Sequence, residues 1–222
     1  MRLQAYVLTS LTEIIPAILT DSSDKFRELV HKLEFHTGRI HIDIADGDFV
    51  PNKTIKGYND LREIKSSAQF DVHLMVKRPQ EVIKEWFNTQ AERFIIHAES
   101  DVNLNEIIKD IKERNRKVGL SLNPETYVDK IEQYLNEIDF VQFMTVHPGF
   151  QGSNFVNEVV DKISAFHKKY PDIMIMCDGG ITSETAPKLV KAGASVLVSG
   201  SYIVKSQNFK KAIEELNGAI LK

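Results

Sequence analysis

Strand-like and helix-like segments alternate along almost the whole chain, and this alternation limits the possible folds more than any other feature. Strands that alternate with helices pair in parallel, because each helix returns the chain to the starting end of the sheet. Eight repeats in 222 residues leave about 28 residues for each, which suits a compact (β/α)8 barrel. We expect strands at 14–19, 40–45, 69–76, 93–97, 117–122, 139–146, 173–177 and 195–199. We expect the main helices around 26–33 and at 79–88, 103–114, 126–136, 154–169, 183–191 and 208–220.

These repeats predict a single α/β domain that spans residues 1–222. No low-complexity segment, linker or shift in composition divides the chain. Residues 1–13 are predicted to form an N-terminal extension, with the barrel starting near residue 14. An open, doubly wound sheet is the competing architecture for the same alternation.

The second predicted strand combines an apolar face with a polar one. Because side chains alternate along a strand, Ile40, Ile42 and Ile44 share one face. His41 and Asp43 share the other face. Ionisable groups on a strand that is covered on both sides are costly unless they are paired, hydrogen-bonded or bound to a metal. The polar face therefore predicts a functional site.

Two later strands carry the same kind of residue. His73 lies on the polar face of the third predicted strand, and Asp178 ends the seventh. In a (β/α)8 barrel, functional residues gather at the carboxyl ends of the strands. We therefore expect two imidazoles and two carboxylates to meet at the barrel mouth and bind one divalent metal ion. The alternative is that local hydrogen bonds satisfy each group separately.

Two short glycine-containing loops predict a phosphate site. Gly179 and Gly180 follow the seventh strand, and Gly200 and Ser201 follow the eighth. Loops in these positions of a barrel often hold a phosphate on backbone N–H groups. The alternative is that each loop is only a tight turn.

The loop over 146–152, rich in glycine and proline, follows the sixth strand and is predicted to cover the substrate. Ordinary turn chemistry is the alternative. Met75 and Met144 lie at strand ends where their sulfur atoms could face the site, although methionine commonly just fills gaps in a core.

The charge balance and the cysteine content indicate which partners and which cellular compartment to expect. A net charge of −3 with no basic cluster argues against a nucleic-acid partner. The single cysteine cannot form an intrachain disulfide and fits a reducing compartment. No apolar run approaches the roughly 20 residues that cross a bilayer, and the N-terminus lacks the pattern of a signal peptide. We expect a cytoplasmic protein with no membrane partner.

From Ile14 onward, the sequence resembles the ribulose-phosphate 3-epimerase family. The family pattern His-x-Asp-x-Met-Asp-Gly-x-Phe-Val-Pro-Asn matches 41–52, with Ala45 in place of Met. Four further family patterns match: Asp-x-His-Leu-Met-Val at 71–76, Met-x-Val-x-Pro-Gly-Phe-x-Gly at 144–152, Asp-Gly-Gly-Ile at 178–181, and Gly-Ser at 200–201.

This resemblance implies a metal-dependent epimerase that interconverts D-ribulose 5-phosphate and D-xylulose 5-phosphate through an enediolate. It implies Asp43 and Asp178 as the two acid/base groups on opposite faces of C3. The implied ligands of one divalent ion (Zn, Fe, Mn or Co) are His41, Asp43, His73 and Asp178. The implied contacts to substrate and phosphate are Met75, Met144, Gly149, Phe150, Gln151, Gly152, Gly179, Gly180, Gly200 and Ser201. The resemblance also implies carbohydrate metabolism in the pentose phosphate pathway, and a tendency to form homo-oligomers.

At several positions this sequence differs from the family pattern, and these differences leave other functions possible. Ala17 replaces a serine that would meet the substrate, and Ala45 removes one methionine of a sulfur cushion. His147, Gln151 and Ser153 alter the covering loop. A 3-epimerase of allulose 6-phosphate fits the same catalytic residues, and a non-catalytic sugar-phosphate binder is a further alternative. A barrel lyase such as a hexulose-phosphate synthase would need a lysine in the site, which the second, third and seventh strands do not offer on their inner faces.

Two residues close to the predicted site have open roles. His97, on the fourth strand near Glu99, either supports the site or is an ordinary buried histidine. Cys177 precedes Asp178 and is predicted to point to the outer face of the barrel.

Overall fold

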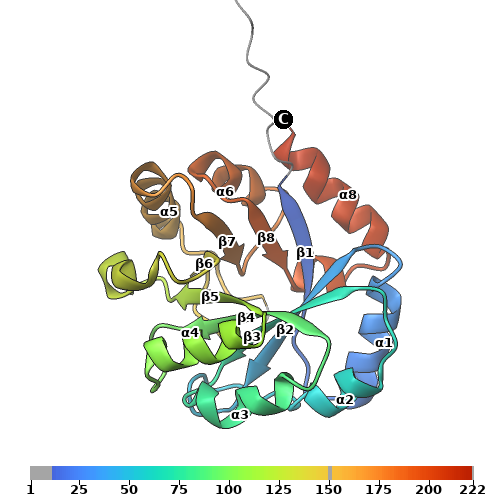
Figure 1. The fold of residues 1–222 in the computed structure, drawn as a ribbon. Coiled ribbons are helices and arrows are strands. Elements are labelled where there is room, and N and C mark those ends of the chain that lie inside the picture. The colour runs from blue at the N-terminus through green and yellow to red at the C-terminus, as the bar shows by residue number, and fades with distance from the viewer. Residues whose placement is uncertain (1–11, 150–151, 222) are drawn as a thin grey trace, which may run out of the picture.

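The protein folds into a closed barrel of eight parallel strands surrounded by helices (Figure 1). A computed structural model describes residues 12–149 and 152–221. The strands are β1 (Glu13–Ile18), β2 (Arg39–Ala45), β3 (Gln69–Met75), β4 (Ala91–His97), β5 (Lys117–Leu122), β6 (Phe140–Met144), β7 (Met174–Asp178) and β8 (Val196–Ser199). Each strand pairs with its neighbour in sequence, and β1 pairs with β8 to close the ring. The predicted (β/α)8 barrel is confirmed. The alternative of an open sheet is wrong, because an open sheet has two unpaired edge strands, whereas β1 and β8 pair with each other here.

Helices cover the outside of the barrel (Figure 1). They are α1 (Ser23–Leu33), α2 (Tyr58–Glu63), α3 (Pro79–Trp86), α4 (Leu104–Glu113), α5 (Glu158–Lys169), α6 (Ala186–Ala192), α7 (Ser201–Val204) and α8 (Phe209–Ile220). Side-chain caps fix several starts: Ser22 accepts from the N–H of Lys25, and Asn208 accepts from that of Lys211. The short helices α2 and α7 were not predicted from the sequence.

The helix expected at 126–136 is wrong. Two 3₁₀ turns, η1 (Val128–Lys130) and η2 (Glu132–Tyr134), replace it. The reason lies in the spacing of the apolar side chains. Val128, Ile131 and Tyr134 recur every third residue, and a 3₁₀ helix aligns residues three apart on one face. Ile131 and Tyr134 are buried accordingly.

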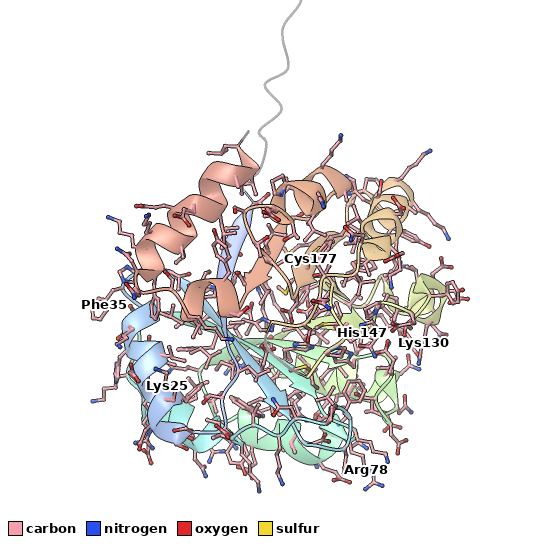
Figure 2. All side chains as sticks on the ribbon, turned by 180° about the vertical axis from the view of Figure 1, so that it is seen from behind. Lys25, Phe35, Arg78, Lys130, His147 and Cys177 are labelled. Carbon is pink, nitrogen blue, oxygen red and sulfur yellow. The ribbon has the colours of Figure 1, made fainter. Side chains whose placement is uncertain are left out.

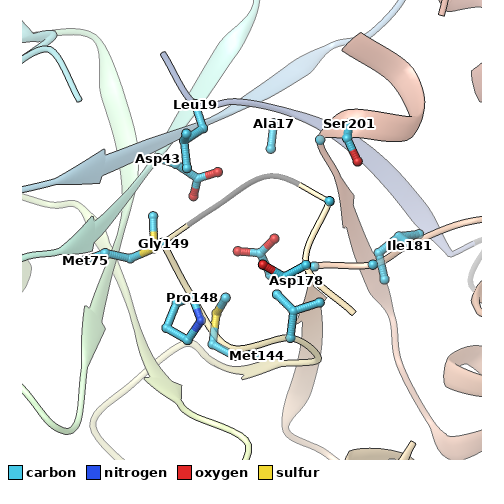
Figure 3. A pocket seen from close by; sticks show the side chains of 16 residues that line it. Ala17, Leu19, Asp43, Met75, Met144, Pro148, Gly149, Asp178, Ile181 and Ser201 are labelled. Atoms are coloured by element: carbon cyan, nitrogen blue, oxygen red, sulfur yellow. The ribbon is translucent and has the colours of Figure 1, made fainter. Parts of the chain in front are cut away.

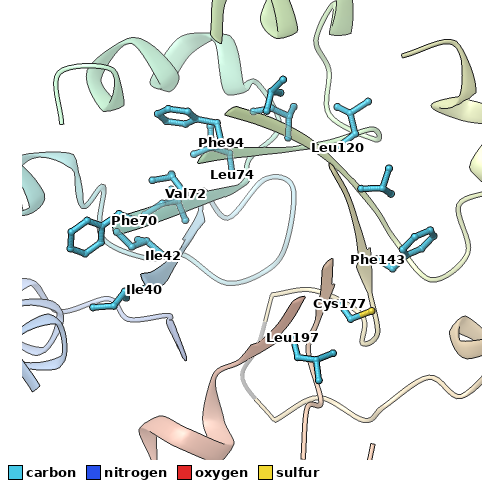
Figure 4. Packing of buried hydrophobic residues seen from close by; sticks show 14 of the residues in the cluster. Ile40, Ile42, Phe70, Val72, Leu74, Phe94, Leu120, Phe143, Cys177 and Leu197 are labelled. Atoms are coloured by element: carbon cyan, nitrogen blue, oxygen red, sulfur yellow. The ribbon is translucent and has the colours of Figure 1, made fainter. Parts of the chain in front are cut away.

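The strands carry apolar side chains on both faces. The outward-facing residues of β2 and β3, including Ile40, Ile42 and Val72, pack under the helices (Figure 4). Cys177 belongs to this outer layer, as predicted. A second, smaller cluster lies inside the barrel; it contains Ile15, Ala17, Ile95, Phe140, Met176, Val196 and Val198. The alternation predicted for β2 is therefore confirmed.

The amino-terminal end of the barrel holds a buried ion cluster. Arg39 Nη1 lies 2.7 Å from Asp71 Oδ1, and Arg93 Nη1 lies 3.6 Å from Asp71 Oδ2. Asp71 and His73 share the inner face of β3, but they lie at different levels of the barrel. Asp71 lies two residues before His73, about 7 Å along the strand, and it is the ladder neighbour of His41. The cluster therefore forms the layer of inner side chains beneath the groups at the carboxyl ends, and its ion pairs offset the burial of the Asp71 carboxylate.

The outer surface is strongly charged. Lys25, Arg78 and Lys130 project from the outside of the molecule, whereas Cys177 lies in its interior (Figure 2). Among the described residues, no helix is both long and apolar enough to cross a membrane.

Candidate metal centre and active site

Four ionisable side chains from three strands converge at the carboxyl end of the barrel. His41 and Asp43 come from β2, His73 from β3 and Asp178 from β7. All four are buried, with at most 8% of any residue exposed. Each offers one ligand atom, and these atoms lie within 4.8 Å of one another. Strand register produces the convergence, because Asp43 is the direct neighbour of His73 across the β2–β3 ladder.

The distances between the four groups fit a single cation. His73 Nδ1 lies 2.9 Å from Asp43 Oδ1 and 3.3 Å from Asp178 Oδ2. His41 Nε2 lies 3.3 Å and 3.8 Å from the same two carboxylate atoms. Metal–ligand bonds of about 2.1 Å place neighbouring ligand atoms about 3.0 to 3.4 Å apart in octahedral or tetrahedral geometry. Three of these four distances match that spacing to within about 0.1 Å, and the fourth is slightly longer.

His41 gives a second sign of fit. Its side chain is fully buried, yet neither ring nitrogen has a hydrogen-bond partner among the residues that the structure describes. Nε2 is near both carboxylates but lacks the alignment that a hydrogen bond needs. Buried polar atoms without partners are rare in folded proteins, and a cation bonded to Nε2 would satisfy this one.

Burial and mutual attraction oppose each other in the site. Burial alone would raise the pKa of Asp43, but the rings of His41 and His73 hold it well below its ordinary value. Burial alone would lower the pKa of His73, but Asp178 and Asp43 outweigh it and raise this pKa to about 9. The carboxylate of Asp43 is therefore ionised at neutral pH, which suits it both as a metal ligand and as a proton acceptor.

A pocket opens directly above these groups. Figure 3 shows the carboxylates of Asp43 and Asp178 pointing into it, with the side chains of Met75 and Met144 on one side. Ala17 also lines the pocket, so the wall there is a methyl group rather than a hydroxyl. Ala45 packs with Val50 and Met75 beside it.

Eight of the ten residues predicted to bind substrate or phosphate line this same pocket. They are Met75, Met144, Gly149, Gly152, Gly179, Gly180, Gly200 and Ser201. The other two, Phe150 and Gln151, lie outside the described residues. The binding roles of all ten stay predictions.

The chain turns sharply after Asp178 because the next residue is glycine. Gly179 has φ +102°, a conformation that side chains with a Cβ rarely adopt, and a Cβ there would collide with Val146 Cγ2. Thr145 holds this turn from the neighbouring strand end, since its N–H donates to the carbonyl of Asp178 over 2.8 Å. The turn keeps the Asp178 carboxylate and the backbone of Gly180 on the same wall of the pocket.

Sequence reasoning missed one buried polar residue of the site. Gln142 lies on the inner face of β6, and its Nε2 is 3.2 Å from His73 Nε2 and 3.4 Å from Asp178 Oδ2. A glutamine between Phe140 and Met144 on an otherwise apolar inner face was the available signal.

Comparisons with known proteins agree with the motifs. The model of the "Ribulose-phosphate 3 epimerase family" matches residues 13–204. The "Ribulose-phosphate 3-epimerase" of Bacillus subtilis is 40% identical over 187 residues, covering 81% of this chain and 86% of the relative. The protein of the same name from Schizosaccharomyces pombe is 33% identical, covering 95% of this chain and 94% of the relative.

Solved structures with lower identity show the fold alone. Orotidine 5'-monophosphate decarboxylase from Sulfolobus solfataricus has a TM-score of 0.67 at 16% identity, covering 95% of this chain and 98% of its own. 3-Hexulose-6-phosphate synthase from Salmonella typhimurium has a TM-score of 0.68 at 14% identity, covering 94% and 98%.

Proposed function

The chain belongs to the ribulose-phosphate 3-epimerase family of enzymes that epimerise carbohydrates, and from that premise we propose that it inverts C3 between D-ribulose 5-phosphate and D-xylulose 5-phosphate. One observation carries the proposal: two buried carboxylates and two buried histidines converge under a pocket with glycine-rich walls. The proposed setting is the pentose phosphate pathway of the cytoplasm.

We propose that one divalent ion (Zn, Fe, Mn or Co) is held by His41, Asp43, His73 and Asp178. Such an ion would supply positive charge next to the substrate oxygens on which negative charge develops. The mixed nitrogen and oxygen ligands suit several first-row metals, so the donor set does not select among them.

The two carboxylates provide the proton transfers. One of Asp43 and Asp178 takes the proton from C3, and the electrons of the broken C–H bond move toward the C2 carbonyl to give an enediolate. The other carboxyl group donates a proton to the opposite face of C3, so the configuration inverts. Inversion needs two groups because a single base could only return the proton to the face from which it came. Asp43 and Asp178 suit this task because they enter the pocket from strands that are not neighbours in the barrel.

The glycine-rich loops after β7 and β8 are proposed to bind the substrate phosphate. Gly180, Gly200 and Ser201 line the pocket next to Asp178. Backbone N–H groups bind an anion without a lysine, so the net charge of −3 does not oppose this role.

A 3-epimerase of allulose 6-phosphate is the second candidate. Ala17 keeps it open, because a methyl group lines the pocket there and takes less room than the side chain of a serine would. Both sugars carry the same reacting carbon, so the proposed chemistry is identical. The ratio of kcat/KM for the two sugars separates these candidates.

Isotope exchange tests the proposed reaction. Purified protein is incubated with D-ribulose 5-phosphate in heavy water with Zn, Mn, Fe or Co, and deuterium at C3 is measured by NMR. We expect exchange with at least one metal, and we expect Asp178→Asn to abolish it while the far-UV CD spectrum is preserved. Asp60→Asn is the matched control, because Asp60 is also a buried aspartate but pairs with Arg27 on the outer helices. Absence of exchange with every metal refutes the proposal, and so does exchange by Asp178→Asn at the normal rate.

A further inference from the structure

Behind His73, a line of buried polar groups leads away from the pocket. His73 Nδ1 faces the two carboxylates, and Nε2 on the other side of the ring lies 2.9 Å from Nε2 of His97. The opposite nitrogen of His97, Nδ1, lies 3.1 Å from Glu99 Oε2. Both histidines are fully buried, and the carboxylate of Glu99 is mostly so.

The surroundings of His97 fix its ring. Its ring is nearly coplanar with the ring of His73, with an interplanar angle of 21°, so the two rings meet edge to edge at their Nε2 atoms. Phe49 packs on the ring of His97 with a centroid distance of 4.7 Å. Glu99 is fixed as well, because its Oε1 accepts the N–H of Asn123 over 2.9 Å. The line of contacts is therefore preformed.

Counting protons along this line gives one consistent assignment. The carboxylate of Glu99 can only accept, so Nδ1 of His97 carries a proton. The Nε2 atoms of His97 and His73 lie 2.9 Å apart, a distance at which only one of them can carry the proton between them. Nδ1 of His97 already carries the single proton of a neutral ring, so Nε2 of His97 keeps its lone pair. That lone pair requires a proton on Nε2 of His73. Nδ1 of His73 is then the nitrogen that can bind a cation, and binding displaces at most one proton, the one on Nδ1 itself.

We infer that Glu99 and His97 are positioning residues that keep the proton of His73 on Nε2 and thereby reserve Nδ1 for the metal ion. The inference rests on the metal site proposed above. A metal-bound histidine commonly donates its second N–H to a protein acceptor, which fixes the ring and raises the basicity of the ligand atom. In this chain the acceptor is itself a histidine, and Glu99 fixes its tautomer.

Gln142 offers the competing arrangement. Its amide nitrogen lies 3.2 Å from His73 Nε2 and could donate to that atom if the atom carried no proton. His73 would then be protonated on Nδ1, facing the carboxylates. The shorter contact to His97 favours the first arrangement, and the same amide has other acceptors in Asp178 and Ser121.

The two arrangements predict different protonated nitrogens, which ¹⁵N NMR of the imidazoles distinguishes in the metal-free protein. We expect His97 to be protonated on Nδ1 alone, and His73 to be protonated on Nε2. A proton on Nε2 of His97, or none on Nε2 of His73, overturns the inference. This readout needs neither metal nor substrate, so it decides the inference even if the exchange assay gives no activity.

Metal affinity provides the second test, by competition of a chelator with the Zn²⁺-loaded protein. Glu99→Gln removes the charge that fixes His97, and we expect it to weaken Zn²⁺ binding by about 10- to 100-fold. Glu92→Gln is the control, because Glu92 is an ion-paired glutamate near the start of β4, whereas Glu99 follows the end of that strand. We expect this control to bind Zn²⁺ with an affinity within about twofold of the unmodified protein.

Substitution of His97 separates positioning from packing. His97→Gln keeps an oxygen that can accept from His73, whereas His97→Phe keeps the ring volume but no acceptor. We expect the His97→Gln variant to keep most of the Zn²⁺ affinity and the His97→Phe variant to lose it. We expect both variants to fold. Equal affinities for these two variants, or equal losses for Glu99→Gln and Glu92→Gln, overturn the inference.

Discussion

Replacing Gly179 by alanine should destabilise the protein for two separable reasons. The first is the backbone, since φ of +102° costs an alanine about 1–2 kcal/mol. The second is the collision of the new Cβ with Val146 Cγ2. Val146 is only 5% exposed, so it has little room to move aside, and overpacking of this kind costs about 1–3 kcal/mol. The free energy of unfolding should therefore fall by about 2–5 kcal/mol.

A double-mutant cycle separates the two contributions. In the Val146→Ala background the collision is removed, so Gly179→Ala should cost only the backbone share of about 1–2 kcal/mol. The coupling energy should be about 1–3 kcal/mol. A second cycle in the barrel interior serves as the control. A Cβ on Gly119 would collide with the ring of Phe140, but φ of Gly119 lies outside the left-handed region. In the Phe140→Val background, Gly119→Ala should therefore cost almost nothing.

Urea unfolding measures both cycles. The single tryptophan, Trp86, is 1% exposed and gives a fluorescence signal for loss of the core. Additive effects of Gly179→Ala and Val146→Ala, to within about 0.5 kcal/mol, would show that the predicted collision does not exist. A zero cost of Gly179→Ala in the Val146→Ala background would refute the argument from φ. Because Gly179 lines the pocket, KM for the sugar phosphate should rise in the same variant.

Three further predictions concern other parts of the structure. Because the pKa of His73 is raised to about 9 in the metal-free protein, a bound cation displaces a proton below that pH. Metal affinity should therefore rise up to about tenfold per pH unit until about pH 9 and then level off, as measured by chelator competition; a flat profile would contradict this. Lys162→Met removes three hydrogen bonds from Nζ to the carbonyls of residues 123, 124 and 126, and it should lower the free energy of unfolding by about 1–3 kcal/mol in urea. A loss below about 0.5 kcal/mol would show that these bonds are replaced by water. Arg39→Met leaves the buried carboxylate of Asp71 without its closest cation and should cost about 3–5 kcal/mol, with recovery on addition of Asp71→Asn. The kcat per folded molecule of Arg39→Met should be unchanged. A fall in kcat would show that the ion cluster around Asp71 affects catalysis at the carboxyl end of the barrel.

The barrel could be predicted because its signals are local. The period of two in β2 assigned Ile40 and Ile42 to the outer layer, and the structure confirms it. Each strand–helix repeat buries its own apolar face, so the pattern can be identified repeat by repeat. The prediction failed at 126–136, where an apolar spacing of three favours 3₁₀ turns over an α-helix.

The surroundings of the site could not be predicted in the same way. Gln142 and His97 reach His73 from β6 and β4, and their positions depend on the register between strands. The sequence of one strand does not contain its register against another. Asp71 shows the same limit: it shares a strand face with His73, yet its position along the barrel pairs it with Arg39.

The sequence by itself determined the repeat, the inward and outward faces of the strands, and the four ionisable residues at the strand ends. Side-chain alternation and strand–helix order set all of these, and both are properties of short segments. Only the tertiary structure decided which atoms of those residues face one another and which groups stand behind them. Closure of the ring brings β2, β3 and β7 to a common centre, and the register of the ladders then sets the contacts to within an ångström.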